Sequence, residues 1–577
     1  MRILATLALT ACCLLAPGQP AAPLRAAEPE GATGREDRPA LVAPKTMVVA
    51  ANPHAVAAGV EMLRAGGSAV DAAIAVQMVL GLVEPQSSGI GGGAFLLHWS
   101  QDAKRVRSYD GRETAPAAAR ASRFLGADGT PLAPRDAIVG GRPVGVPGLL
   151  RMLELAHREH GRLPWARLFE PAIRLAEGGF AVSPRLHRLL DRERDLGADA
   201  MARQLFYTAD DHARPAGEHI VNAEYAATLR AIAAGGADAF YRGAIAEDLV
   251  RAVRNHANAG DLTLEDLAAY SALEREPVCG AYRDWRICGM GPPSSGGTGV
   301  LQLLGILERS PFAQAPPQSA QALHWFAEAG RLAYADRLRY VADPAFVPQP
   351  VAGLLEPAYL DARARLLGER SIGRAQAGAP RGATAMSDAA EYALAGTSHI
   401  SIVDERGDAV AMTTTIEDGF GSRIMVRGFL LNNQLTDFAF VPEVGGRPVA
   451  NRVEAGKRPR SSMSPTFVFD ADGSLRIVIG SPGGTAIINY VAKALVAMLD
   501  WGMDAQAAAA LPNFGSRNGP TEIERGSAYS ALIPELRARG HDLNVLNLTS
   551  GLHVIERVPG GWRGGADPRR EGVVRGD

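Results

Sequence analysis

The hydrophobic periodicity of this chain changes once along its length, and this change limits the folds available to it. Apolar residues recur at three- and four-residue spacing over residues 52–83 and through most of residues 140–380, which is typical of helices. From Ser371 to Gly396 the periodicity is lost, and Ala, Gly, Ser and Arg predominate. Such a composition indicates a mobile linker over residues 371–396.

After the linker the pattern becomes typical of short strands joined by turns. Residues 397–404 and 409–415 predict one strand pair, and residues 466–469 and 475–479 predict another. A helix is expected over residues 485–501, and an earlier strand over residues 94–99. We therefore expect a helix-rich first two thirds and a strand-rich last third.

Composition excludes several classes of protein. The chain has 577 residues, of which 47% are hydrophobic and 21% charged, so it can bury a large core and is neither disordered nor fibrous. Its 60 basic and 62 acidic residues give a net charge of −2, which argues against a dedicated nucleic-acid-binding protein. Four cysteines are too few for a disulfide scaffold. Length alone suggests several domain-sized units.

The first 27 residues resemble a secretory signal peptide. An apolar run from Ile3 to Leu15 follows Arg2 and is followed by Pro, Gly and small residues. The run is shorter than the roughly 20 residues that a membrane helix needs. Residues 9–12 also fit a lipoprotein box ending at Cys12, which is the less favoured alternative. The expected location is the periplasm or the medium.

Cys279 and Cys288 flank a segment that fits a hairpin with Arg283-Asp284 as its turn. Such a hairpin places the two cysteines directly opposite each other, close to the spacing that a disulfide needs. We predict a disulfide; two reduced core cysteines are the alternative, and a metal pair is less favoured because no His or Cys cluster is near in sequence.

Motifs of the common nucleotide and metal enzymes are missing or misplaced. The glycines of residues 89–94 follow a helix and precede a strand, the reverse of the order in a dinucleotide-binding turn. Polar clusters instead gather where strands of the last third end, and such loop ends often carry functional sites. These clusters are residues 396–399, 413–415, 428–438, 457–465 and 480–484.

Together with earlier segments, these clusters resemble the gamma-glutamyltransferase (glutathione hydrolase) family of self-cleaving N-terminal-nucleophile hydrolases. The resemblance runs from about residue 45 to residue 572. The earlier and final segments that carry it are residues 52–54, 66–73, 91–93, 110–116, 292–297 and 566–570.

The resemblance implies an α+β fold with four αββα layers and extra helices. It implies cleavage between Gly396 and Thr397, giving a large subunit of residues 28–396 and a small subunit of residues 397–577. The two are expected to form one co-folded heterodimeric unit over residues 28–577. No metal or organic cofactor is implied.

Thr397 is the implied nucleophile. Its hydroxyl would attack the preceding carbonyl, and the ester would hydrolyse to leave Thr397 as a new N-terminus. A free α-amine has a pKa of about 7.7–8.0 and can serve as base for the hydroxyl of its own residue. Thr415 matches a second threonine that hydrogen-bonds the nucleophile; otherwise it is an ordinary strand residue. Gly483 and Gly484 match the oxyanion-hole residues, and they also fit a strand-to-helix turn.

The remaining matched residues bind the amino-acid end of the substrate. Arg112 matches an arginine that binds the α-carboxylate, a task suited to its forked donors. The other matches are Ser461 and Ser462 on the same carboxylate, and Gln434 and Asp437 on the α-ammonium. A surface ion pair for Arg112 and turn capping for the serines are the ordinary alternatives.

Glu417 departs from the family pattern, which has Asn there. A carboxylate still accepts from an ammonium group, but an anion beside the substrate carboxylate is expected to weaken affinity or alter the preferred acyl group.

The expected reaction is transfer of a γ-glutamyl group from glutathione or a related amide to Thr397, and then to water or to an amino acid or peptide. One alternative is a related acylase acting on glutaryl or cephalosporin-type amides, and a second is a secreted binding protein without activity. A glutaryl group has no α-ammonium for Gln434 and Asp437 to bind, which disfavours the acylase, whereas Glu417 keeps that alternative open.

Overall fold

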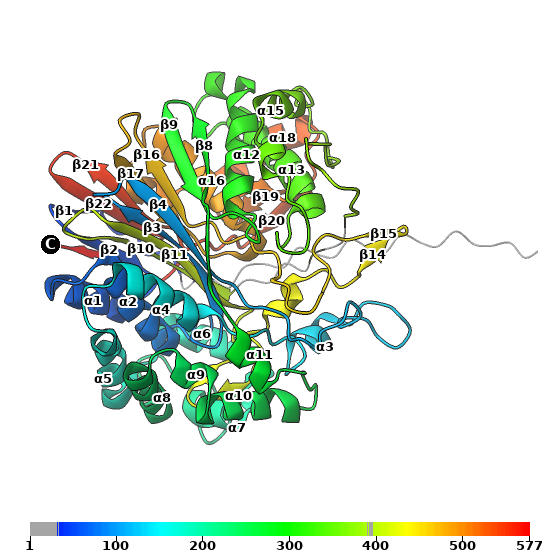
Figure 1. The fold of residues 1–577 in the computed structure, drawn as a ribbon. Helices are drawn as coiled ribbons and strands as arrows, with labels where there is room; N and C mark the ends of the chain where they lie inside the picture. The colour runs from blue at the N-terminus through cyan, green and yellow to red at the C-terminus, as the bar shows by residue number, and fades with distance from the viewer. Residues whose placement is uncertain (1–31, 33, 389–390, 392–395) are drawn as a thin grey trace, which may run out of the picture.

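The computed structural model describes residues 32, 34–388, 391 and 396–577. Two seven-stranded sheets face each other, and helices cover the outer face of each (Figure 1). The predicted α+β class and the four αββα layers are confirmed. The first sheet runs β23 (Val573–Gly576), β2 (Met47–Ala50), β10 (Gly396–Val403), β11 (Ala409–Glu417), β3 (Gly93–Ser100), β4 (Arg105–Gly111) and β7 (Leu273–Arg275). The second runs β1 (Leu41–Ala43), β22 (Gly561–Ala566), β21 (His553–Val558), β17 (Leu475–Gly480), β16 (Thr466–Phe469), β9 (Trp285–Gly289) and β8 (Val278–Tyr282).

Alternation along the strands divides the core into layers. In β2, Val48 and Ala50 pack in the cluster formed with the helices, whereas Met47 and Val49 pack in the cluster that includes the second sheet. Successive strand residues point to opposite faces, so a strand buried on both sides has no polar face. This arrangement explains why all four residues of β2 are buried.

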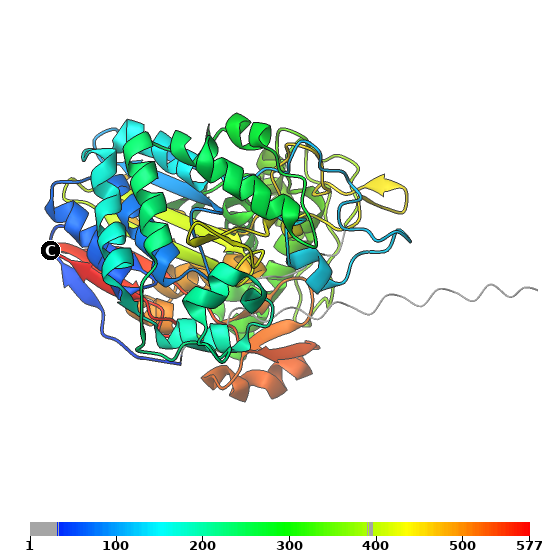
Figure 2. The same ribbon diagram turned by 90° about the horizontal axis from the view of Figure 1, so that it is seen from below.

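The helices over the first sheet begin where local sequence predicts. Asn52 caps α1 (Pro53–Arg64), and Ser68 with Asp71 forms the predicted capping box of α2 (Ala69–Val83). Every residue of α2 is buried, because α2 lies between the sheet and outer helices. Seen from below in Figure 2, the outer helices lie across this sheet. They include α5 (Glu170–Gly178) and α8 (Ala223–Gly235), whereas α4 (Leu149–His160) packs directly on β3 and β4.

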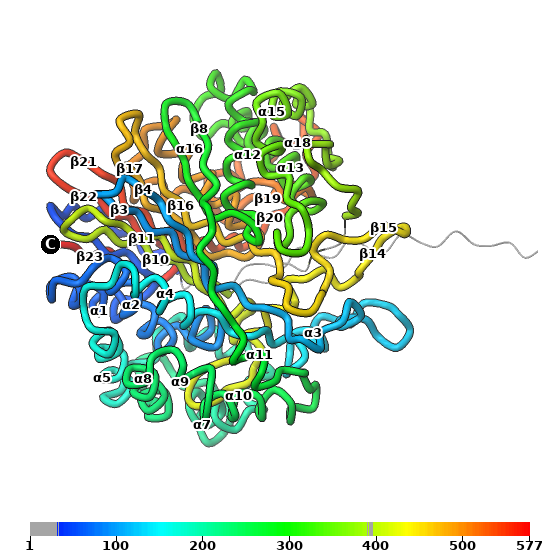
Figure 3. Tube along the Cα trace, in the orientation of Figure 1, coloured from blue at the N-terminus to red at the C-terminus, as the bar shows by residue number. Residues whose placement is uncertain are grey.

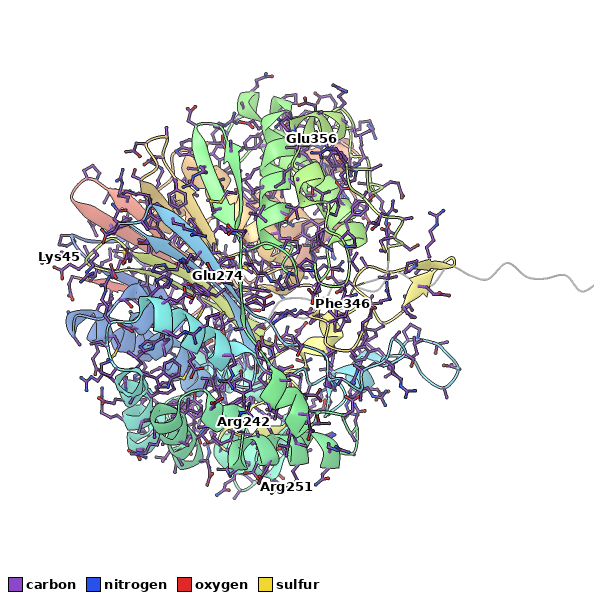
Figure 4. All side chains as sticks on the ribbon, viewed as in Figure 1. Lys45, Arg242, Arg251, Glu274, Phe346 and Glu356 are labelled. Atoms are coloured by element: carbon purple, nitrogen blue, oxygen red, sulfur yellow. A yellow bond between two sulfur atoms is a disulfide. The ribbon has the colours of Figure 1, made fainter. Side chains whose placement is uncertain are left out.

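The second sheet is covered by another helical layer. It contains α12 (Gly296–Glu308), α13 (Ala320–Tyr340), α15 (Pro357–Ala364), α16 (Ile487–Leu499) and α17 (Ala505–Ala510). Charged side chains line the outside of the molecule, as Arg242 and Arg251 show at the rim of the opposite layer (Figure 4).

Both sheets contain strands from before and after Gly396. β10 pairs with β2 on one side, and β11 pairs with β3 on the other, so blue and yellow-green segments lie side by side in Figure 3. The expectation of a helix-rich first two thirds therefore understated its strands, since β2, β3, β4, β8 and β9 all come from it.

The segment before β10 has no helix or strand over residues 371–388, but it is held in place. The amide of Ala375 donates to Asn518 Oδ1 at 2.7 Å, and the amide of Gly378 donates to Asp336 Oδ1 at 2.7 Å. Asp388 pairs with Arg339 at 2.9 Å. The predicted mobile linker is thus anchored along its described part, because polar side chains of the body bind its backbone.

The predicted signal peptide, residues 1–27 with Cys12, lies outside the described residues. Within the described ranges, no helix has both the length and the apolar character needed to cross a membrane. The structure contains the Cys279–Cys288 disulfide, with the two residues opposite each other in the β8–β9 hairpin.

The sheets approach most closely beside the end of β17. A Cβ atom added at Gly480 would lie 2.2 Å from the ring of the buried His399 in β10. We therefore expect Gly480→Ala to lower the free energy of unfolding by about 1–3 kcal/mol through overpacking. Thermal or chemical unfolding measures this loss.

Gly178→Ala is the control, because its added Cβ would have nothing within 4 Å. Equal stability of the two variants would contradict the close approach of the sheets.

Candidate active site

The predicted site residues come together in one pocket. It holds about 330 Å³ of empty space between the ends of the sheets and the start of α16. Its lining residues are Arg112, Thr397, Thr415, Glu417, Gln434, Asp437, Ser461, Ser462, Met463, Gly484, Thr485 and Ile487. Gly396 directly precedes the lining residue Thr397 in the chain, and Gly483 directly precedes Gly484. Sequence reasoning did not assign Met463, Thr485 or Ile487 to the site, although Met463 lies within the predicted cluster 457–465 and the other two lie just after the cluster 480–484.

The strand pair β10–β11 positions the threonines. Thr397 lies directly opposite Thr415, and Gly396 lies opposite Glu417, so the register shifts by one residue and Ile416 is unpaired. Glu417 takes φ of +83°, a backbone conformation rare for residues other than glycine. Such irregularities re-aim side chains and are common beside active sites.

Thr415 contacts the peptide bond that precedes Thr397. Its hydroxyl donates to the carbonyl oxygen of Gly396 at 2.6 Å and accepts from the amide of Glu417 at 2.8 Å. A donor on a carbonyl oxygen stabilises negative charge that develops there during nucleophilic attack. The uncut chain therefore presents a polarised carbonyl at the predicted cleavage position.

Gly483 and Gly484 form a turn between β17 and α16. Their φ angles are +135° and +56°, and a Cβ at Gly483 would lie 2.4 Å from the ring of Tyr490. Position 483 therefore requires glycine, and Gly484 lines the pocket at the start of the short helix η5 (Gly484–Ala486) that leads into α16. The N-terminal end of a helix favours negative charge.

Arg112 and Asp437 pair with each other in the pocket. The guanidinium of Arg112 also donates to the carbonyls of Pro459 at 3.1 Å and Arg460 at 3.0 Å. Its Nη1 is buried and has no hydrogen-bond partner, with Glu113 at 3.7 Å. Arg112 thus retains one buried donor group that a carboxylate could satisfy.

Acceptors without partners lie on another side of the pocket. Gln434 donates through Nε2 to Asp437 at 2.9 Å, which leaves its Oε1 buried and unpartnered. Oε2 of Glu417 is also buried and unpartnered. Among the described lining residues, Arg112 thus has a hydrogen-bond donor without a partner, and Gln434 and Glu417 have acceptors without partners. A ligand that carries both a carboxylate and an ammonium group would match these donors and acceptors.

Burial alters the protonation of two carboxyl groups here. Burial, Asp437 and Asp418 raise the pKa of Glu417 well above its ordinary value. The neutral form of this carboxyl group is therefore favoured relative to that of an exposed glutamate. Burial also raises the pKa of Glu113 to about 8, although Arg112 opposes the shift.

The two serines keep their hydroxyl hydrogens available. Ser461 Oγ accepts from the amide of Met463 at 3.1 Å, and Ser462 Oγ accepts from Arg337 Nη2 at 2.6 Å. Each oxygen is held by a donor, so its own hydrogen can point to a ligand. Arg337 lies on α13, more than a hundred residues from Ser462, and no sequence signal linked them.

Among the described residues, one cluster has the composition of a metal site: His324, Glu328 and His541. Its members are already bound to one another and to the protein. His324 Nδ1 and His541 Nε2 are 2.8 Å apart, and Glu328 pairs with Arg331 at 2.7 Å. This cluster is a buried hydrogen-bond network remote from the pocket's lining residues.

Known proteins resemble this chain along nearly all of its length. A sequence model of the family described as Gamma-glutamyltranspeptidase matches residues 55–576. The chain belongs to the gamma-glutamyltranspeptidase family. The glutathione hydrolase proenzyme of Bacillus subtilis (strain 168) is 34% identical over 543 residues, which cover 92% of this chain and 91% of that protein. The glutathione hydrolase proenzyme of Escherichia coli (strain K12) is 35% identical over 539 residues, covering 91% and 90%.

The fold of this chain is also similar to that of a solved structure. The crystal structure of the cephalosporin acylase from Bacillus halodurans superposes with a TM-score of 0.82 at 26% identity. The superposition covers 98% of this chain and 99% of the acylase. The family architecture thus accommodates proteins named for two different amide substrates.

The raised pKa of Glu113 predicts a pH dependence of stability. Between pH 4.5 and about 8 the folded chain keeps a proton that the unfolded chain releases, so stability falls as pH rises through this window. Glu113→Gln removes this pH-dependent contribution to the free energy of unfolding. Its stability relative to the natural chain should increase with pH by at most about 1.4 kcal/mol per pH unit.

Unfolding curves at pH 5, 6, 7 and 8 measure the difference, with the exposed Glu276→Gln as control. A difference that stays constant across these pH values would contradict the protonation of Glu113.

Proposed function

We propose that this chain is an autoprocessing enzyme that cleaves the γ-glutamyl bond of glutathione and related amides through an ester on Thr397. The observation that carries the proposal is the pairing of spare donor and acceptor atoms in the pocket. A γ-glutamyl group carries an α-carboxylate for Arg112, Ser461 and Ser462, and an α-ammonium for Gln434 and Asp437. Oε2 of Glu417, which is buried without a hydrogen-bond partner, can accept from the same ammonium group.

Maturation starts from the polarised carbonyl of Gly396. The Thr397 hydroxyl oxygen attacks this carbon, and the Thr415 hydroxyl stabilises the charge on its oxygen. The bond from carbon to the Thr397 nitrogen then breaks, and the nitrogen takes up the proton that the hydroxyl has lost. Water hydrolyses the resulting ester, which frees a carboxyl group on Gly396 and the amine of Thr397.

Turnover reuses the same oxygen. The free amine of Thr397 accepts the hydroxyl proton, and the oxygen attacks the γ-carbonyl of the substrate. Backbone amides at Gly483 and Gly484 stabilise the oxyanion, and the departing amine leaves with the proton. Water then releases glutamate, or the amine of an amino acid or peptide takes the acyl group.

We further propose that residues 28–396 and 397–577 stay together as a heterodimer after the cut. Strands of both parts pair with each other in each sheet, so separating them would break β10 from β2 and β11 from β3. The signal-like residues 1–27 support export to the periplasm or the medium.

The alternative is an acylase for glutaryl or cephalosporin-type amides, as the name of the Bacillus halodurans neighbour illustrates. A glutaryl group would satisfy Arg112 but would leave the buried acceptor of Gln434 without a donor, which costs free energy. A binding protein without activity would need neither Thr397 nor the polarised carbonyl beside it.

Mass analysis and two chromogenic substrates test the proposal. Purified protein should consist of two chains, one of them beginning at Thr397, and should hydrolyse γ-glutamyl-4-nitroanilide faster than glutaryl-4-nitroanilide. Thr397→Ala should remain one chain. An uncut natural protein, or a preference for the glutaryl compound, would overturn the proposal.

Thr415→Val should slow self-cleavage about 10- to 100-fold, because it removes the donor to the Gly396 carbonyl while preserving side-chain shape. Thr414→Val is the matched control, since the Thr414 hydroxyl is buried without a hydrogen-bond partner. Gel analysis of freshly synthesised chain measures the rate. Equal cleavage of both variants would refute the role of Thr415.

A further inference from the structure

A buried cluster of two arginines and one carboxylate adjoins the Ser462 side of the pocket. Arg337 binds Glu391 through two nitrogens, at 2.6 and 2.9 Å, and Arg460 binds the same carboxylate at 3.2 Å. The side chains of both arginines are 3% exposed, and that of Glu391 is 14% exposed. Two buried positive charges therefore share one negative charge.

Glu391 is a strongly held anion. Burial alone would raise its pKa, but Arg337 and Arg460 outweigh burial and lower the pKa to about 2. Paired guanidinium groups of this kind are well suited to carboxylates. The two arginines thus form a carboxylate-binding site, which Glu391 of the same chain occupies.

The cluster connects to the pocket through one hydroxyl group. The same Nη2 of Arg337 that binds Glu391 also donates to Ser462 Oγ at 2.6 Å. Because that oxygen accepts from a cation, the hydrogen of Ser462 is polarised and directed away from Arg337. Arg460 lies beside Ser461 in sequence, and its carbonyl binds Arg112.

Glu391 also lies on the acyl side of the bond that is cut. Residues 391–396 precede the Gly396 carbonyl, so Thr397 receives this segment as its first acyl group, just as it later receives a γ-glutamyl group. Cleavage leaves Glu391 five residues from a free chain end.

We propose that Arg337 and Arg460 form a second, inner part of the carboxylate site, which Glu391 neutralises only while the chain is uncut. Cleavage releases Glu391, and the positive charge of Arg337 and Arg460, no longer neutralised, then attracts the substrate α-carboxylate that the Ser462 hydroxyl binds. Arg337 and Arg460 are then positioning residues, and the inference rests on the cleavage and substrate class proposed above.

The uncut chain gives the most direct test. Calorimetry compares binding of L-glutamate and of its α-amide, which lacks the α-carboxylate, to Thr397→Ala and to Thr397→Ala with Glu391→Gln. Removing the internal anion should tighten L-glutamate binding about 5-fold and leave α-amide binding within 2-fold. Thr397→Ala with Asp388→Asn is the matched control, because it breaks the neighbouring pair with Arg339 and does not touch Ser462.

The mature enzyme gives the complementary test. Arg460→Gln should raise the inhibition constant of L-glutamate about 5-fold and leave that of the α-amide within 2-fold, whereas Glu391→Gln should leave both unchanged or lower. A loss of L-glutamate affinity in Glu391→Gln, or no gain in the uncut chain, would mean that the cluster is only a structural clamp. If Arg460→Gln does not fold, the comparison of L-glutamate binding with and without the isosteric Glu391→Gln change in the uncut chain still distinguishes a carboxylate site from a structural clamp.

A failure of the proposed function is recognisable separately. The natural chain would then remain uncut, or neither L-glutamate nor its α-amide would compete for its site.

Discussion

The pairing of β10 with β11 is the constraint on which the rest of the site depends. It places Thr397 opposite Thr415 in the interior of a seven-stranded sheet, and the one-residue shift at Gly396 brings the preceding carbonyl to the Thr415 hydroxyl. Strands from the earlier part of the chain flank the pair on both sides. The carbonyl next to Thr397 is therefore held within the sheet, whereas the earlier residues 371–388 are held by contacts with side chains of the body.

Buried charge organises the pocket around this pair. Arg112, Arg337 and Arg460 are almost fully buried, and each is matched by carboxylates or carbonyl oxygens. Burying a charge is costly unless it is paired, so the arrangement of partners is specific. Burial raises the pKa of two acidic groups here, that of Glu113 to about 8 and that of Glu417 well above its ordinary value. The pocket thus combines fixed positive charge with acidic groups whose charged form is disfavoured.

In the proposed reactions, self-cleavage and turnover use the same Thr397 oxygen and the same part of the pocket for the acyl group. In the uncut chain, Glu391 and the Gly396 carbonyl occupy the acyl side, with the carboxylate near Ser462 and the carbonyl on Thr415. A γ-glutamyl group has the same two functions, a carboxylate and a reactive carbonyl. This similarity gives a physical reason why one site can process its own chain and then an external amide.

The sequence by itself determined the elements that depend on neighbouring residues. The capping box at Ser68, the hairpin that opposes Cys279 and Cys288, and the strands on both sides of residues 405–407 follow from local spacing and turn chemistry. The order of motifs was enough to place Thr397, Arg112 and Asp437 in one family pattern. These features can be predicted from the sequence because the hydrogen bonds and the periodicity that produce them act within a few residues.

Only the tertiary structure decided the features that join distant segments. It anchored residues 371–388 to the body, brought Arg337 on α13 to Ser462, and buried Glu417 so deeply that the pKa of its carboxyl rises well above the ordinary value. Each outcome depends on desolvation and on partners contributed by other elements of the fold. The spacing of residues along the chain does not show the desolvation of a group or its distant partners. A pKa and a long-range contact depend on what packs around the group in the folded chain.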